Sequence, residues 1–260
     1  MRDFAQRGGV RTARTSAALL LADATNPLDN AGHAIALIEQ QYTELLGGSR
    51  LRTGPILAKY SHAFRDLAAK AADSAARKRT ARLAQEMTDA ARVLPCSSTH
   101  AMFVCVDETK CHVLKVLLTG VHGTPYAGGC YEFDVYCPPE YPDVAPKVQL
   151  VTTGNGSIRF NPNLYANGKV CLSLLGTWAG KGGETWSAAS TLLQVYSSIQ
   201  SLVMSDEVYF NEPGFENAVG TPDGVRLNQG YANIVRFGNV KYAILGQLLN
   251  PSPAFASVIR

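Results

Sequence analysis

The sequence predicts an α+β fold, in which helices flank a four-stranded antiparallel meander. Two observations support this prediction. Apolar residues recur at helical spacing up to about residue 93, and from Ala101 onward they fall into short runs separated by Gly, Pro and Asp. Because these runs follow one another without helical segments between them, a meander is favoured over a doubly wound parallel sheet.

The first 75 residues are expected to form a helical extension of unknown function. The apolar residues on one face of a first helix are Ile35, Ile38, Tyr42, Leu45 and Leu46. Gly47-Gly48 would end this helix, and Pro55 suits the first turn of a second one. The arginines among the first 22 residues leave a transit peptide open as an alternative to a frayed N-terminus.

A third helix is predicted from Ser74, its N-cap, to about Val93, and Pro95 would prevent it from continuing. Its inward-facing residues would be Leu83, Met87, Ala90 and Ala91. The basic residues on its outward face would be Arg77, Lys78, Arg79 and Arg82. A solvated face and a partner-binding face are both compatible with this pattern.

The predicted strands lie near residues 101–106, 111–119, 130–137 and 147–152. Pro146 has no backbone N–H to donate, so it must sit at the start of a strand or at a sheet edge. A buried helix capped by Ser190 would run to about Ser205, and one or two further helices would occupy residues 225–249.

The bulk composition argues against several classes of protein. A net charge of +3 over 260 residues is too small to indicate nucleic-acid binding. No apolar run reaches 18 residues, so no membrane span is expected. The six cysteines form no C-x-x-C pair and precede no histidine at finger spacing, so we predict neither a metal site nor a cofactor. Reduced thiols in the cytoplasm or the nucleus are the natural interpretation.

One loop carries the candidate chemistry, and it runs from Arg159 to Leu175 with the sequence RFNPNLYANGKVCLSLL. It places Cys171 after a stretch rich in Pro, Asn and Gly and directly before a buried apolar segment. Only a thiolate is nucleophilic, so we expect this thiol to be partly exposed beside polar neighbours. The amide of Asn163 can donate hydrogen bonds to the oxyanion that forms when a thiol attacks a carbonyl.

The order Asn-Pro-Asn at 161–163, then Gly168, then Cys171-Leu172 resembles the active-site segment of ubiquitin-conjugating enzymes. Further matching groups are Thr124-Pro125-Tyr126, Gly128-Gly129 and Tyr141-Pro142. The resemblance implies a conjugating core domain over about residues 76–250, followed by a tail at 251–260.

This sequence departs from the usual family pattern at two places. Asn161 replaces the usual histidine, and we expect it to hold the turn by hydrogen bonds from its side chain to the backbone. The long insertion before Trp186 is similar to that of very large hybrid members of the family. Its segment GTWAGKGGE, residues 176–184, is expected to be a mobile flap near the thiol.

The resemblance implies that Cys171 receives ubiquitin, or a ubiquitin-like modifier, as a thioester from an activating enzyme and passes it to a lysine of a protein substrate. It implies that Asn163 stabilises the oxyanion and that Tyr165 and Glu212 orient the incoming amine. The basic face of the third helix would engage the activating enzyme. The residues that correspond to the family's ligase-docking loop are Trp186, Ser187 and Ala188, the last in place of the usual proline.

Asp143 stands where ligase-binding members carry an apolar residue, so partial independence of a ligase is expected. Two other classes of function stay open. One is a binding-only module of the same fold, although such members lack the cysteine that this chain keeps. The other is a cysteine hydrolase, which needs a histidine base that the sequence does not pair with Cys171.

Overall fold

The computed structural model describes residues 27–70, 76–178 and 185–260. The chain divides into two compact units, Met1–Leu45 and Leu46–Arg260. In the first unit, the described residues belong to helix α2 (Pro27–Leu46), which confirms the first predicted helix. The arginine-rich start lies outside the described residues, so the transit-peptide alternative stays a prediction.

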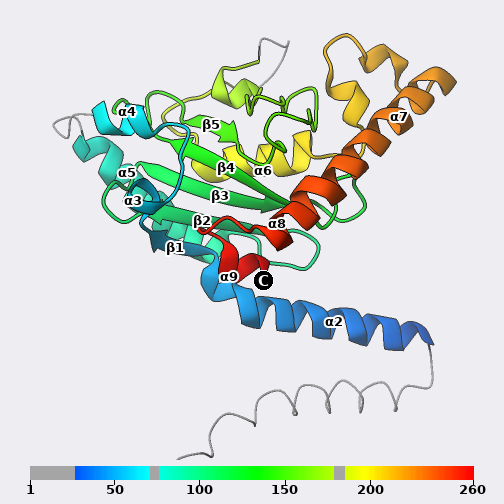
Figure 1. Cartoon of the computed structure of the whole chain (residues 1–260), viewed down its shortest axis with the longest axis horizontal. Helices are drawn as coiled ribbons and strands as arrows, with labels where there is room; N and C mark the ends of the chain where they lie inside the picture. The colour runs from blue at the N-terminus through cyan, green and yellow to red at the C-terminus, as the bar shows by residue number, and fades with distance from the viewer. Residues whose placement is uncertain (1–26, 71–75, 179–184) are drawn as a thin grey trace, which may run out of the picture. The chain divides into compact units, whose positions relative to one another are not determined.

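The second unit is built on a sheet with the strand order β1-β2-β3-β4-β5 (Figure 1). The strands are β1 (Leu51–Gly54), β2 (Met102–Asp107), β3 (Val113–Thr119), β4 (Cys130–Tyr136) and β5 (Lys147–Leu150). Strands β2 to β5 form the predicted antiparallel meander, and Pro146 directly precedes β5. Strand β1, which pairs in parallel with β2, corrects the prediction of a wholly helical extension. Its four residues are too few to show a period, and its partner is distant in sequence.

Helices lie before and after the strands in the chain. The α-helices of the second unit are α3 (Ile56–Lys59), α4 (Arg65–Lys70), α5 (Ala76–Val93), α6 (Leu192–Ser198), α7 (Pro222–Gly238), α8 (Gly246–Leu249) and α9 (Ala256–Ile259). The 3-10 helices are η1 (Gly47–Ser49), η3 (Ser173–Leu175), η5 (Val208–Asn211) and η6 (Glu216–Ala218). The π-helical segments are η4 (Ile199–Val203) and η7 (Asn239–Leu245). No helix within the described ranges is long and apolar enough to cross a bilayer.

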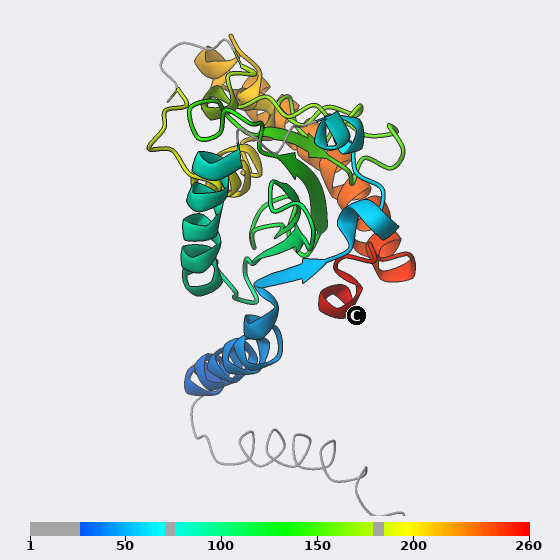
Figure 2. The same ribbon diagram turned by 90° about the vertical axis from the view of Figure 1, so that its left-hand side faces the viewer.

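Helices α5 and α6 pack on one face of the sheet (Figure 2). The buried residues that join the two helices to the strands in one core include Leu83, Ala90, Leu192, Val195, Val116 and Phe133. Helix α5 confirms the third predicted helix from Ala76 onward, whereas its predicted cap, Ser74, lies outside the described residues. Ala91, predicted to face inward, is exposed.

The cap of α6 differs from the sequence prediction by one residue. Thr191, not Ser190, is the N-cap: its hydroxyl accepts a hydrogen bond from Gln194 N, and the Gln194 side chain accepts one from Thr191 N. This reciprocal capping box satisfies two N–H groups that a helix start leaves free. The predicted helix continues through η4 as far as Val203.

The opposite face of the sheet carries a buried charge cluster. Lys115 Nζ lies 2.8 Å from Glu132 Oε1 and 2.7 Å from Asp134 Oδ1. Two segments outside the meander, one before it and one after it in the chain, cover these groups: Ala63 N donates to Asp134 Oδ2 at 2.7 Å, and Ser252 Oγ donates to Glu132 Oε1 at 2.9 Å. The covering hydrogen bonds matter because a buried charge is costly unless its partners are complete.

The end of the chain, predicted to be a tail, packs on this same face. Phe255 is fully buried, and the Arg52 guanidinium lies 5.8 Å from its ring centroid. Arg52 Nη1 and Nη2 each donate to Ser257 Oγ at 3.0 Å. Residues from β1 and from the last ten positions therefore belong to the same packed layer.

The segment around Ala63, which covers the charge cluster, also carries the buried, titratable side chain of His62. Its Nε2 lies 3.1 Å from Leu114 O, and its Nδ1 accepts a hydrogen bond from Phe64 N at 3.2 Å, an arrangement that suits neutral imidazole. Burial lowers the pKa of His62, aided by the positive charges of Lys115 and Arg65 and opposed by Asp134. In the unfolded chain this pKa is about 6.5.

We therefore expect stability to fall as the pH drops below about 6.5, because the unfolded chain then binds a proton that the folded chain excludes. The added slope would reach at most about 1.4 kcal/mol per pH unit. Urea titrations between pH 8 and pH 5 measure it. His62→Gln should flatten this dependence, whereas the exposed His122→Gln should not. Identical slopes in both variants would contradict the assignment to His62.

Candidate active site

The cysteine loop, residues 159–175, is held against the sheet edge by backbone pairing. Leu150 N donates to Gly168 O at 2.8 Å, and an isolated bridge joins Gln149 to Lys169. Gly168 has a φ of +87°, and a Cβ at this position would lie 2.5 Å from Leu150 O. Both the backbone conformation and the close approach therefore require glycine here.

Asn161 fixes the turn that precedes the cysteine. Its buried Nδ2 donates to Tyr126 Oη at 3.0 Å and to Val203 O at 2.8 Å. Its Oδ1 accepts from Asn163 N at 2.9 Å, and Tyr126 Oη donates in turn to Phe160 O at 2.8 Å. The prediction that Asn161 holds the turn through side-chain hydrogen bonds is confirmed.

Cys171 is joined directly to Asn163, because Cys171 N donates to Asn163 O at 2.9 Å. The structure thus places the backbones of the predicted nucleophile and the predicted oxyanion donor side by side. It corrects the predicted exposure, since Cys171 is only 5% exposed. The apolar neighbours Val170 and Leu172, both buried, draw the cysteine towards the core.

Thr177 holds the backbone next to the cysteine, a role that no sequence pattern indicated. Its hydroxyl donates to Val170 O at 2.7 Å and accepts from Leu172 N at 3.0 Å. The backbone on both sides of Cys171 is thus tied to one threonine. Residues 179–184 of the predicted flap lie outside the described residues.

Three other cysteines are poor candidates for a nucleophile. Burial raises the pKa of Cys105 and of Cys130 to about 11, and it raises the pKa of Cys137 well above the ordinary thiol value. These thiols are therefore protonated at neutral pH. The side chains of the described residues form no group of three His, Cys, Asp or Glu that could hold a metal ion.

Arg159 links the two side chains predicted to orient an amine. Its guanidinium carbon lies 4.3 Å from the Tyr165 ring centroid, and its Nη2 donates to Glu212 Oε2 at 3.2 Å. The same Nη2 donates to Pro162 O at 2.6 Å, which fixes the arginine to the cysteine loop. Sequence reasoning missed Arg159, because nothing in a linear pattern indicates that it bridges two distant residues.

The predicted basic face of α5 is only partly exposed. Arg77 and Lys78 are exposed, and Lys78 Nζ pairs with Asp143 Oδ2. Arg79 corrects the prediction: it is 1% exposed, and its Nη1 donates to Cys137 O at 3.2 Å. Arg79 is therefore part of the packing between α5 and the sheet and is not available to a partner.

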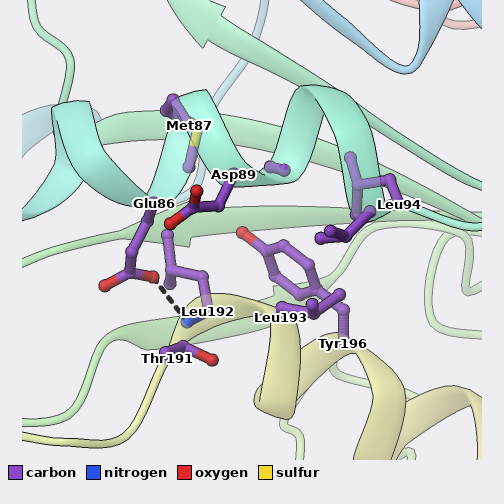
Figure 3. Close-up of a pocket in the computed structure, with 10 residues that line it drawn as sticks. Glu86, Met87, Asp89, Leu94, Thr191, Leu192, Leu193 and Tyr196 are labelled. Atoms are coloured by element: carbon purple, nitrogen blue, oxygen red, sulfur yellow. Dashed lines mark hydrogen bonds between the residues drawn. The ribbon is translucent and has the colours of Figure 1, made fainter.

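Arg82 and Glu86 connect α5 to the loop before α6. Arg82 Nε donates to Glu86 Oε1 at 2.6 Å, and its Nη2 donates to Ser190 O at 2.7 Å. Glu86 also accepts from Tyr141 Oη and, at 2.8 Å, from Leu192 N, as the dashed line in Figure 3 marks. A hollow of about 80 Å³ lies beside this carboxylate, between α5 and α6 (Figure 3).

Trp186 anchors the predicted ligase-docking loop. Its Nε1 donates to Pro142 O at 2.6 Å, and its ring centroid lies 5.7 Å from that of Tyr141. Ser187 and Ala188 follow it and are exposed. Two loops that are distant in sequence therefore present one surface next to α5.

Comparisons with known proteins give a consistent result. The sequence model described as "Ubiquitin-conjugating enzyme" matches residues 82–219, more than half of the chain. The dual E2 ubiquitin-conjugating enzyme/E3 ubiquitin-protein ligase BIRC6 of Homo sapiens is 52% identical over 189 residues, which cover 72% of this chain and 4% of that protein. Probable ubiquitin-conjugating enzyme protein 17 of Caenorhabditis elegans is 45% identical over 183 residues, which cover 70% of this chain and 25% of that protein.

The E2 domain of a Toxoplasma gondii ubiquitin-conjugating enzyme has a solved structure with a TM-score of 0.47 and 24% identity; the match covers 64% of this chain and 99% of that domain. The chain thus spans only a small part of the length of the human and the Caenorhabditis elegans relatives.

Asn161→Ala should lower the free energy of unfolding by about 1–3 kcal/mol, because it removes the buried partner of Tyr126 Oη and of Asn163 N. Urea denaturation followed by circular dichroism measures the change. Asn167→Ala is the matched control, since this exposed amide in the same loop accepts only a local hydrogen bond from Lys169 N. If both variants lose the same stability, Asn161 is not the anchor of the turn.

Proposed function

The chain belongs to the ubiquitin-conjugating enzyme family, and we propose that it carries ubiquitin, or a ubiquitin-like modifier, as a thioester on Cys171 and transfers it to a lysine of a protein substrate. One observation carries this proposal: Cys171 N is hydrogen-bonded to the carbonyl of Asn163 at 2.9 Å, in a loop whose turn is fixed by a buried amide. The proposed nucleophile and the proposed oxyanion donor thus belong to one hydrogen-bonded loop.

Two transfers make up the proposed reaction. The Cys171 thiolate first attacks the thioester carbonyl of the modifier on an activating enzyme, whose thiol leaves. A neutral substrate lysine amine then attacks the new thioester; a C–N bond forms, the C–S bond breaks, the amine loses a proton and the Cys171 thiolate departs. Because Cys171 is only 5% exposed, a slender, extended chain end can reach its sulfur more readily than a folded surface can.

Asn163 is assigned the oxyanion in the second transfer. Its backbone N–H and C=O are engaged with Asn161 Oδ1 and Cys171 N, so the side-chain amide is the group proposed to donate to the developing charge. Tyr165 and Glu212 are proposed to receive the lysine, since a carboxylate orients an amine and an apolar ring lowers its pKa. Arg159 holds both of these groups in place.

The partner surfaces are proposed from exposure. Arg77 and Lys78 on α5 are exposed and are proposed to bind the activating enzyme, together with the half-buried Arg82 of the same helix. A ligase would meet Trp186, Ser187 and Ala188. Asp143, paired with Lys78, places a charge next to that surface and weakens apolar docking, so we propose partial independence of a ligase.

The cytoplasm or the nucleus is the proposed location, because six free cysteines suit a reducing compartment.

Cys171→Ala should abolish a reducible adduct when the protein is incubated with activating enzyme, ATP and ubiquitin, because the attacking sulfur is gone. Non-reducing gels measure the adduct. Cys130→Ala, which removes a thiol in β4 whose pKa burial raises to about 11, should keep it. An equal loss of adduct in both variants would refute the assignment.

Asn163→Ala should still accept ubiquitin but discharge it to free lysine about 10²–10³ times more slowly, because one oxyanion donor is lost. Single-turnover discharge after the activating enzyme has been quenched measures this rate. Asn167→Ala removes an exposed amide from the same loop and should discharge at the wild-type rate. Unchanged discharge by Asn163→Ala would remove the oxyanion role.

A further inference from the structure

A groove of about 420 Å³ lies beside the cysteine loop, and it extends from residues of the proposed active site to helix α7. Pro162 and Arg159 line it from the cysteine loop, and Glu212 lines it as well. Helix α7 forms the other side with Leu227, Tyr231 and Ile234. The groove therefore connects the residues around the nucleophile to a helix that the proposed mechanism does not use.

The position of the groove relates it to the second transfer. Pro162 directly precedes Asn163, whose carbonyl accepts from Cys171 N at 2.9 Å. Glu212 is the carboxylate proposed to receive the attacking amine. A lysine held at Glu212 would consequently place its neighbours along the chain in the groove.

The walls of the groove are apolar and exposed. Leu227, Tyr231 and Ile234 follow one another at four and three residues, so they share one face of α7. Leu227 is 39% exposed and Ile234 is 59% exposed. Phe215 and Tyr209 also line the groove, and they stack with ring centroids 4.6 Å apart and an interplanar angle of 11°.

The charges at the groove distinguish the lysine from its flanking residues. Glu212 lines the groove and pairs with Arg159 Nη2 at 3.2 Å, but its side chain is 39% exposed, so a lysine can reach the carboxylate. Arg226, with a side chain 73% exposed, also lines the groove and pairs with Asp223 Oδ1 at 3.4 Å. Glu212 is the only acidic side chain among the described residues that line the groove, so one lysine has a carboxylate to approach and the flanking residues are selected by apolar contact.

We infer that this acceptor groove binds the segment of the protein substrate around the acceptor lysine and selects an aromatic or large aliphatic side chain close to that lysine. This inference rests on the proposed function, because it assigns a substrate preference to the same transfer. The occupant follows from continuity: Glu212, which is proposed to receive the lysine, and Pro162, which precedes Asn163, both line this groove, so residues next to that lysine have the groove beside them. Burying one large apolar side chain there strengthens binding by about tenfold.

The experiment uses the full chain loaded with ubiquitin, in single-turnover discharge to acetylated heptapeptides with one central lysine. One peptide has serine at all other positions, and six others each place a phenylalanine at one position from −3 to +3. We expect at least one phenylalanine peptide to be discharged about tenfold faster than the serine peptide, at concentrations below saturation. Free lysine is run in parallel as an acceptor without neighbours.

Variants on α7 provide the matched control. Leu227→Ser combined with Ile234→Ser should bring the ratio of phenylalanine to serine peptide rates to within about twofold of one, because the apolar wall is lost. Phe237→Ser removes a residue of the same helix that is 66% exposed and lies outside the groove, and it should keep the wild-type ratio.

The outcomes separate the two proposals. Loading and discharge to free lysine without any preference among the peptides would overturn the acceptor groove and leave the proposed function standing. An equal fall of the ratio in the Phe237→Ser variant would also overturn it, since the preference would then not come from the groove. Absence of any adduct would remove the proposed function and the acceptor groove with it.

Discussion

The need to satisfy one buried amide organises the active region. The Asn161 side chain is fully buried, so each of its polar atoms must find a partner inside the protein. Those partners come from three places: Tyr126 between β3 and β4, Val203 at the end of η4, and Asn163 in the loop itself. Satisfying Asn161 therefore ties the sheet, a helix and the cysteine loop into one unit. Cys171 inherits its position because its backbone N–H is bonded to Asn163.

Both faces of the sheet are covered, one through apolar packing and the other through charged groups and hydrogen bonds. Apolar side chains from α5 and α6 fill one face, where no directional partner is needed. On the other face Lys115, Glu132 and Asp134 are buried together, and the two carboxylates accept hydrogen bonds from Lys115, from Ala63 N and from Ser252 Oγ. A charge cluster of this kind specifies which segments must cover it, because a misplaced cover would leave a charge without a partner. The result is a sheet whose surface for chemistry is restricted to one edge.

At that edge, rigidity and access oppose one another. Thr177 and Asn163 tie the backbone on both sides of the cysteine, and Cys171 keeps only 5% of its surface exposed. A nucleophile held in this way loses little conformational freedom when it reacts, but it admits only a narrow reactant. Arg159 also holds the side chains of Tyr165 and Glu212 in place, and both Arg159 and Glu212 line the acceptor groove.

The sequence by itself determined the four-stranded meander, a helix ending at about Val93 and the hydrogen bond by which Asn161 holds the turn at Asn163, because each depends on local periodicity or local hydrogen bonding. It also identified the cysteine loop, through a short and specific order of residue types. Only the tertiary structure decided that Leu51–Gly54 is a strand, that Arg79 is buried and that Arg159 joins Tyr165 to Glu212. Each of these depends on a partner far away in the chain, and such partners leave no trace in a local pattern.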